Sequence, residues 1–248
     1  MDFSNRHVVI TGASSGIGLA TATRIVALAG RVSLIARRAE VLGNVQHALG
    51  ERASCWSVDV SNKHDLLTAL DGAINRNGPI DGLFLNAAAG GSFVPIWDYT
   101  DEVFDQLLRV NVQSPFWTVR HVLPAMMARG RGSILVTGSL ASERAMAGNG
   151  GYVVSKHAAL GLARCVAAEV ASSGVRCNCI LPGFIDTSML AAVPQEVRAH
   201  MAKRTPQQRI GEPEEVAKVA AFLLSDDASH VTAQSWAVDG GLLGTLTI

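Results

Sequence analysis

The sequence predicts an α/β protein built on one doubly wound parallel sheet of about seven strands, with helices on both faces. Short apolar, β-branched runs alternate along the chain with longer segments of helical period. The 248 residues contain no Pro/Gly-rich linker, internal repeat or low-complexity tract, so we expect a single domain over residues 1–248. Hydrophobic residues make up 48% of the chain, which is enough for a sizeable core.

The strand-like runs cover residues 7–11, 31–36, 54–58, 82–86, 132–138, 175–181 and 235–238. The helix-like segments between them cover residues 16–29, 38–49, 63–77, 101–129, 151–173 and 213–225. Pro115 is expected to bend the 101–129 segment, and Pro124 to bend or end it. Residues 186–210 fit the alternation least well, and we expect a loop or a pair of short helices there that covers a site.

Composition excludes several classes of function. The formal net charge is zero, so neither a nucleic-acid partner nor an anionic membrane surface is expected. No apolar run reaches the ~20 residues of a membrane span, and the amino terminus does not resemble a signal peptide, so we expect a cytoplasmic protein. The four cysteines do not have zinc-ligand spacing, and we expect them to be buried thiols without a metal.

The stretch VVITGASSGIGLA combines a strand, a glycine-rich turn and a helix start. Gly12, Gly16 and Gly18 allow positive φ and close approach of a ligand, and the first turn of the helix attracts a pyrophosphate. The spacing differs from the common G-x-G-x-x-G pattern, and a tight strand–helix connection is the alternative. Its position after the first strand of a doubly wound sheet favours a dinucleotide site.

The ends of the next three strands refine this prediction. Arg37 and Arg38 follow the second strand, where a guanidinium would pair with a 2′-phosphate, so NADP(H) is favoured and NAD(H) remains possible. Arg37 is nearer the strand end; a solvated helix start is the alternative reading. Asp59 could accept a bond from an adenine amino group or cap the next helix, as Ser61 could. Asn86 could fix the turn after the fourth strand.

Tyr152 and Lys156 lie four residues apart, which places them on one face of a helix. For a phenol to exchange protons at neutral pH its pKa must fall by about 3 units, or ~4 kcal/mol, and a neighbouring ammonium acts in that direction. Ser139 follows a strand and could hold a substrate oxygen, or it could be a cap or turn residue. Asn111 could anchor a water that links Lys156 to solvent, or mark a helix kink before Pro115.

These residues together resemble the short-chain dehydrogenase/reductase family, in its compact form of roughly 250 residues and with its Rossmann fold. The matching pieces are T-G-A-S-S-G-I-G at 11–18, Asp59, N-A-A at 86–88, Asn111, Ser139, Tyr152 with Lys156, P-G at 182–183 with Thr187, and V-D-G-G at 238–241. The resemblance covers nearly the whole chain. Two departures are Leu85 and Ala88, where the family pattern has Asn and Gly.

The resemblance implies an NAD(P)-dependent oxidoreductase that interconverts a secondary alcohol and a ketone by hydride transfer. Tyr152 would be the acid/base, Lys156 its activator and a ribose ligand, Ser139 the holder of the substrate oxygen, and Asn111 the anchor of a relay water. The expected cofactor contacts are Gly12, Ser14, Ser15, Gly16, Ile17, Gly18, Arg37, Arg38, Asp59, Val60, Asn86, Ala87, Ala88, Tyr152, Lys156, Pro182, Gly183, Ile185 and Thr187.

The partner implied is a small carbonyl or alcohol substrate, and the family resemblance implies a homotetramer or a homodimer. The expected pocket wall comprises Gly91, Ser92, Phe93, Trp97, Ser142, Met146, Asn149, Phe184 and the 186–210 lid with Met189 and Leu190. A catalytically silent nucleotide-binding regulator or scaffold on the same fold is the alternative function. The complete Ser139, Tyr152, Lys156 and Asn111 set favours the enzyme.

Overall fold

The computed structural model describes residues 1–191 and 193–245 and is built around one seven-stranded parallel sheet. The strands are β1 (His7–Thr11), β2 (Arg31–Ala36), β3 (Ala53–Ser57), β4 (Gly82–Leu85), β5 (Gly132–Thr137), β6 (Val175–Pro182) and β7 (Ser235–Val238). Their order across the sheet is β3-β2-β1-β4-β5-β6-β7, and every neighbouring pair is parallel. The predicted doubly wound sheet is therefore confirmed, and the order reverses direction between β1 and β4, the point where such sheets bind ligands.

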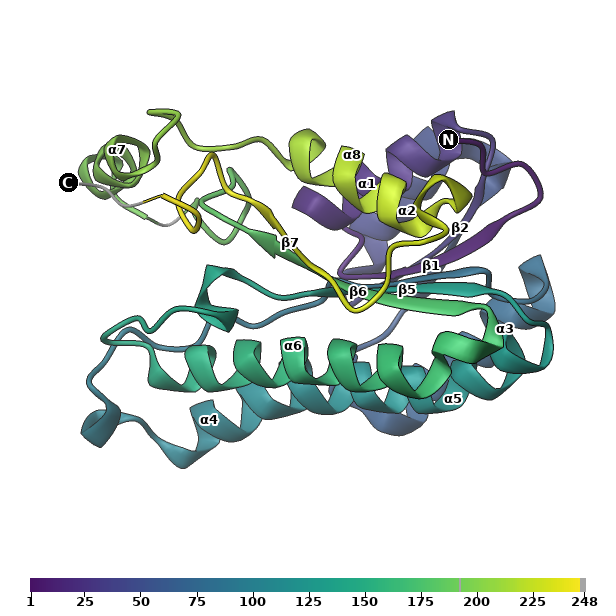
Figure 1. Ribbon diagram of the computed structural model, residues 1–248, viewed down its shortest axis with the longest axis horizontal. Coiled ribbons are helices and arrows are strands. Elements are labelled where there is room, and N and C mark those ends of the chain that lie inside the picture. Colours follow the sequence, from purple (N-terminus) through teal and green to yellow (C-terminus); the bar gives the residue numbers. More distant parts are fainter. Residues whose placement is uncertain (192, 246–248) are drawn as a thin grey trace.

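Helices cover both faces of the sheet (Figure 1). They are α1 (Gly16–Ala27), α2 (Ala39–Leu49), α3 (Lys63–Asn77), α4 (Asp101–Leu108), α5 (Ser114–Ala128), α6 (Gly150–Val170), α7 (Gln195–Arg204) and α8 (Pro213–Leu224). Figure 1 shows α1, α2 and α8 on one side and α3, α4, α5 and α6 on the other, whereas α7 stands apart from both layers.

Two apolar clusters fill the space between sheet and helices. Alternate residues of one strand enter different clusters: Val9 packs with α3, α5 and α6, and Val8 and Ile10 pack with α1, α2 and α8. Because both faces of the sheet are covered, the strands read in the sequence as continuous apolar runs rather than as alternating ones. Because helices cover both faces, polar side chains can gather only at the ends of the strands.

The 101–129 segment is irregular just before Pro115, as the alternative reading of Asn111 predicted. It forms α4, then a π-helical stretch over Arg109–Gln113, then α5. Pro115 closely follows this stretch and cannot donate a backbone hydrogen bond to it, whereas α5 continues past Pro124. Asn111 lies within the π-helical stretch, which matters for the site.

The 186–210 segment carries one helix, α7, among its described residues, and both of its ends are tied to the sheet. The Asp186 amide donates to the Gly211 carbonyl oxygen at 2.8 Å, and the Gly211 amide donates to the Phe184 carbonyl oxygen at 2.9 Å. The Gln207 amide donates to the Gly240 carbonyl oxygen at 3.2 Å. The segment therefore begins and ends at the carboxyl ends of β6 and β7.

Two further expectations can be compared with the structure. Cys177 and Cys179 are buried in β6, but Cys165 on α6 is exposed, so the prediction of four buried thiols is wrong at that position. Its side chain lies on the outer face of a helix whose opposite face packs on the sheet. Of the helices described, none is both long and apolar enough to cross a bilayer.

A buried polar cluster lies between the amino-terminal halves of β1, β2 and β3 and the end of α3. The His7 ring contacts the Gly78 carbonyl oxygen through Nδ1 at 2.9 Å and the Ser33 hydroxyl through Nε2 at 2.8 Å. Asn77 donates to both Ser33 and Ser54 at 2.9 and 2.8 Å. Burial of the imidazole lowers the pKa of His7 below its ordinary 6.5.

This cluster predicts a loss of stability in acid. Since the unfolded chain protonates His7 at a higher pH than the folded one, stability decreases as the pH falls through 6.5. We expect the free energy of unfolding to fall between pH 7 and pH 5 through this residue. In urea titrations at both pH values, His7→Gln should reduce the pH dependence of the free energy of unfolding. The exposed control His157→Gln should leave that pH dependence unchanged. Equal pH dependence in wild type and His7→Gln would contradict the assignment.

Candidate active site

The glycine-rich turn lies where β1 passes into α1, and its glycines allow a close fit. Gly12 and Gly16 have φ of +68° and +54°, and a Cβ on Gly18 would lie 2.4 Å from the Gly12 carbonyl oxygen. The twelve-residue α1 begins at Gly16 with no acidic residue in its first turn and no side-chain cap from any described residue. Its first amides therefore face solvent at the positive end of the helix dipole, which fits the predicted pyrophosphate.

Arg38 approaches this turn more closely than the sequence suggested. Its guanidinium donates to the Ser14 hydroxyl at 3.1 Å and reaches the Ser15 hydroxyl at 3.5 Å. Arg37 is also exposed, and its backbone oxygen accepts a bond from the Ser57 hydroxyl at 3.0 Å. Both cations thus lie at the end of β2, but Arg38 is the one in contact with the glycine-rich turn.

Asp59 shapes the turn after β3. Its Oδ1 accepts hydrogen bonds from the Ser61 amide at 2.9 Å and the Ser61 hydroxyl at 2.8 Å. The cap of α3 is Asn62, whose side chain accepts from the Asp65 amide, so the expectation that Asp59 or Ser61 caps this helix is wrong. The neighbouring Val60 is buried in the core, and its predicted contact with the cofactor stays a prediction.

A chain of hydrogen bonds joins the carboxyl ends of β1, β4 and β5. The Thr11 hydroxyl accepts from the Asn86 and Ala87 amides at 3.0 and 3.1 Å. The Asn86 side chain donates to the Thr11 and Gly12 carbonyl oxygens and accepts from the Thr137 hydroxyl at 3.3 Å. Asn86 therefore fixes the turn after β4, as predicted; sequence reasoning missed Thr11 and Thr137.

Tyr152 and Lys156 lie in the amino-terminal half of α6 beside the end of β5. The Lys156 ammonium donates to the Thr137 carbonyl oxygen at 2.8 Å and lies 5.6 Å from the centre of the Tyr152 ring. Ser139 directly follows β5, and its side chain lies close enough to the Tyr152 phenol to act on the pKa of that phenol. The structure thus brings together the phenol, the ammonium and the serine hydroxyl that the sequence singled out.

Burial dominates the electrostatics of this pair. It lowers the pKa of the Lys156 ammonium to about 8, so the side chain is still charged at pH 7. It raises the pKa of the Tyr152 phenol, and the side chain of Ser139 acts in the opposite direction. The predicted fall of the phenol pKa is therefore wrong for the protein by itself, because the ammonium bonds to Thr137 rather than to the phenol. Tyr152 is consequently protonated at neutral pH.

Asn111 is buried in the π-helical stretch, and its amide bridges two neighbouring elements. Oδ1 accepts from the Ala89 amide at 2.8 Å, and Nδ2 donates to the Ala89 carbonyl oxygen at 3.0 Å and the Ser155 hydroxyl at 2.9 Å. Ser155 in turn donates to the Tyr152 carbonyl oxygen at 2.8 Å. Both amide hydrogens of Asn111 are thus used to hold α6 against the loop after β4, and a role in anchoring water stays a prediction.

The segment after β6 closes over the glycine-rich turn. A Cβ on Gly16 would lie 3.0 Å from the Thr187 methyl carbon, and one on Gly183 would lie 2.7 Å from Asp239 Cα. Ile185 is buried and pairs with Gly211 in a short bridge. Thr187 therefore lies opposite the predicted cofactor turn, whereas Pro182 and Gly183 pack beside the end of β7.

Some residues expected to face a substrate lie elsewhere. Ser142 and Asn149 are only 2% and 1% exposed, and their polar groups bond within the protein. Asn149 accepts a bond from the Tyr99 hydroxyl at 3.2 Å and donates to the Gly90 carbonyl oxygen at 2.8 Å. They support the wall of the site from behind, whereas Phe93 and Trp97 remain exposed.

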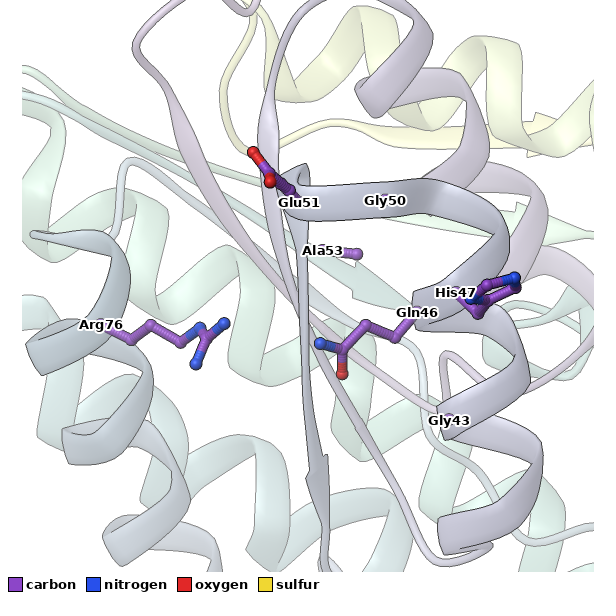
Figure 2. Close-up of a pocket in the computed structure, with 7 residues that line it drawn as sticks. All are labelled: Gly43, Gln46, His47, Gly50, Glu51, Ala53 and Arg76. Carbon is purple, nitrogen blue, oxygen red and sulfur yellow. The ribbon is translucent and has the colours of Figure 1, made fainter.

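Two cavities lie at opposite ends of the sheet. One of about 610 Å³ lies beside β3 and is lined by Gly43, Gln46, His47, Gly50, Glu51, Ala53 and Arg76 (Figure 2). Ala53 begins β3, so this groove is at the amino-terminal end of the strands, away from Tyr152. The other, of about 310 Å³, lies between Phe184, Thr205 and Asp239 at the carboxyl ends of β6 and β7. The smaller cavity is the one on the side of the predicted chemistry.

Comparison with known proteins identifies the family. A family model described as "Enoyl-(Acyl carrier protein) reductase" matches residues 12–243. Cyclohexanol dehydrogenase of Acinetobacter sp. (strain SE19) is 35% identical over 96% of this chain and 95% of that protein. Levodione reductase of Leifsonia aquatica is 35% identical over 96% of this chain and 94% of that protein. The chain belongs to the short-chain dehydrogenase/reductase family.

The fold comparison agrees with this assignment. The crystal structure of a levodione reductase superposes with a TM-score of 0.95, at 33% identity, and covers 98% of this chain and 100% of its own. As a short-chain dehydrogenase/reductase, the protein is an oxidoreductase that interconverts a secondary alcohol and a ketone with NAD(P)(H).

The buried ammonium predicts opposite effects on stability and turnover. A pKa lowered from 10.5 to about 8 corresponds to roughly 3 kcal/mol of destabilisation. This cost is fully present below pH 8 and fades towards pH 10.5, where the unfolded lysine also loses its proton. At pH 7 we expect Lys156→Met to keep or raise Tm while turnover falls by about 100-fold or more. Exposed Lys63→Met should change neither, and wild-type turnover in Lys156→Met would contradict the role of the charge.

Proposed function

We propose that this chain is an NADP(H)-preferring dehydrogenase/reductase of uncharged alicyclic alcohols and ketones, with Tyr152 as the acid/base in a single catalytic domain. The observation that carries the proposal is the meeting of the Tyr152 phenol, the Ser139 hydroxyl and the buried Lys156 ammonium at the carboxyl edge of the sheet. The uncapped amino terminus of α1 lies at the same edge and suits a pyrophosphate.

The three side chains have complementary tasks. Ser139 accepts a bond from the Ala141 amide at 3.2 Å, which leaves its own hydrogen free to donate to a substrate oxygen. Tyr152, protonated at neutral pH, gives its proton to that oxygen when a ketone is reduced and takes it back when an alcohol is oxidised. The Lys156 ammonium stabilises the phenolate left behind. The nicotinamide, when bound, supplies or accepts the hydride.

The substrate class follows from the rim of the site. Phe93, Ile96 and Trp97 are 76%, 72% and 80% exposed, and all three lie on the loop between β4 and α4. Ile96 lies next to Gly150, the first residue of α6, two positions before Tyr152. Across the entrance, Met189 of the lid lies against Gly90. Such a rim favours an apolar substrate body over a charged one.

The names of several relatives support the alicyclic part of this class; one of the named substrates is a carboxylate, so the absence of charge rests on the apolar rim alone. They include cyclohexanol dehydrogenase, a cis-4-hydroxycyclohexanecarboxylate dehydrogenase of Sinomonas cyclohexanicum and a levodione reductase. The first two printed names describe alcohols of a cyclohexane ring. A ring of this kind presents apolar carbons to the rim and one oxygen to Ser139 and Tyr152.

The preference for NADP(H) rests on charge at the end of β2. Arg38 lies against Ser14 of the glycine-rich turn and Arg37 precedes it, so two guanidinium groups are available for a 2′-phosphate. The geometry favours Arg38 as the main contact, with Arg37 as a second. From the family resemblance, we also propose that the protein is cytoplasmic and forms a homotetramer.

Replacement of the phenol tests the acid/base role. We expect Tyr152→Phe to lower kcat by about 1000-fold or more in cyclohexanone reduction and cyclohexanol oxidation, because the proton donor is lost. NADPH affinity and Tm should stay within about twofold and about 2 °C of wild type. Turnover is followed by NADPH absorbance and affinity by fluorescence titration.

The chain offers a matched control, because Tyr99 is its only other tyrosine. Its hydroxyl bonds to Asn149, so Tyr99→Phe should affect mainly KM and lower kcat by at most about tenfold. Tyr152→Phe with wild-type kcat would rule out the proposed acid. NADPH binding without turnover of any alcohol or ketone by the wild type would favour the silent regulator.

Reversal of charge tests the cofactor preference. We expect Arg38→Asp to lower the ratio of kcat/KM for NADP to that for NAD by about 30-fold or more, because a carboxylate repels a 2′-phosphate. Arg37→Asp should lower the ratio by a smaller factor. Both residues are exposed, so Tm should change little. The assignment fails if neither variant changes the ratio.

A further inference from the structure

The proposed reacting groups lie on two different elements. Ser139 belongs to the turn that follows β5 and leads into a short 3₁₀ helix, Leu140–Ser142, whereas Tyr152 and Lys156 belong to α6. One substrate oxygen must meet the hydroxyls of both Ser139 and Tyr152. The reaction therefore depends on the position of the turn relative to the helix, because a misplacement of about 1 Å can cost ~100-fold in rate.

Ser142 connects the backbones of these two elements. Its side chain is 2% exposed. Its hydroxyl donates to the Lys156 carbonyl oxygen at 2.8 Å and accepts from the Ser139 amide at 3.1 Å. The Ser142 hydroxyl thus donates one hydrogen bond to α6 and accepts one from the turn after β5. It does not contact the proposed reacting atoms.

The surroundings of Ser142 hold this hydroxyl in place. A Cβ on Gly138 would lie 2.8 Å from Ser142 Oγ and 2.5 Å from a Leu181 methyl carbon, so only glycine at 138 allows this packing. The Ser142 amide donates to the Ser139 carbonyl oxygen at 2.9 Å. Ser139 and Ser142 are therefore joined in both directions, and a shift of one moves the other.

We propose that Ser142 is a positioning residue, whose buried hydroxyl sets the distance between Ser139 and the helix that carries Tyr152 and Lys156. The inference rests on the proposed function of that site. It assigns to Ser142 a share in the rate without contact with substrate or cofactor. The accepting carbonyl oxygen belongs to Lys156 itself, so the link acts on the residue of α6 that carries the ammonium.

Ser142→Ala tests this role by leaving the Ser139 amide without its partner. We expect kcat for cyclohexanone reduction to fall about tenfold or more, with NADPH affinity within about twofold of wild type. The kinetic pKa of Tyr152 should rise, because Ser139, whose side chain acts to lower it, is less well held beside the phenol. Amide hydrogen exchange at Ser139 should accelerate about tenfold or more.

Two variants separate positioning from general stability. Ser142→Thr keeps the hydroxyl and should recover kcat to within about threefold of wild type. Ser133 is also a buried serine, 4% exposed, and its hydroxyl donates to the Leu223 carbonyl oxygen at 2.9 Å. It lies near the start of β5, at the opposite end of the strand from Ser139. Ser133→Ala should lower Tm to a similar extent and leave kcat and the pH profile unchanged.

The outcomes distinguish this inference from the proposed function. Wild-type kcat, pH profile and Ser139 exchange in Ser142→Ala would overturn the inference and leave the function intact. An inactive wild type would refute the function, and the exchange rate of Ser139 would still decide whether Ser142 holds the turn. If Ser142→Ala does not fold, Ser142→Thr decides, since a loss of turnover despite the retained hydroxyl and unchanged Ser139 exchange would contradict the inference.

Discussion

The hydrogen bond from the Lys156 ammonium to the Thr137 carbonyl oxygen joins the central helix of one layer to the end of a central strand. Lys156 is 2% exposed, so its charge is held where water cannot solvate it. Burial of this charge costs roughly 3 kcal/mol, and the rest of the fold must supply that energy. The cost is explained if the charge acts in the reaction, because an apolar side chain on the same helix would stabilise the protein more.

Hydrogen bonds among the strand ends extend this contact into a continuous polar network. Thr137 reaches Asn86, Asn86 reaches Thr11 and Gly12, and Gly12 belongs to the turn that leads into α1. The glycine-rich turn and the lysine are thus connected through three adjacent strands. In a parallel sheet all carboxyl ends meet at one edge, so short side chains suffice to link elements far apart in the sequence. This network therefore joins the proposed cofactor turn to the proposed acid/base group.

The sequence predicted the parallel sheet and singled out the side chains of Ser139, Tyr152 and Lys156, because both predictions depend on local patterns. Alternation of apolar runs and helical segments predicts a parallel sheet, and the four-residue spacing of Tyr152 and Lys156 is a property of one helix. What the sequence could not show is side-chain direction and tertiary contact. A helix irregularity before Pro115 is one of the two readings of Asn111, but its bonds to Ala89 and Ser155 join elements that are far apart in the sequence. Likewise, the contact of Arg38 with Ser14 of the glycine-rich turn joins residues 24 positions apart.

The two ends of the sheet show which features mark a functional end. At the amino-terminal end His7, Ser33 and Asn77 form a buried cluster whose bonds close among themselves, and burial favours the neutral form of its imidazole. At the carboxyl end the buried network contains a side chain that is still charged at pH 7, and it adjoins Ser139 and Tyr152, two residues that are half-buried. The larger groove nevertheless lies at the edge nearer the first end. The proposed site is therefore chosen by a buried charge beside two hydroxyls rather than by cavity volume, because such an arrangement suits the exchange of a proton with a ligand.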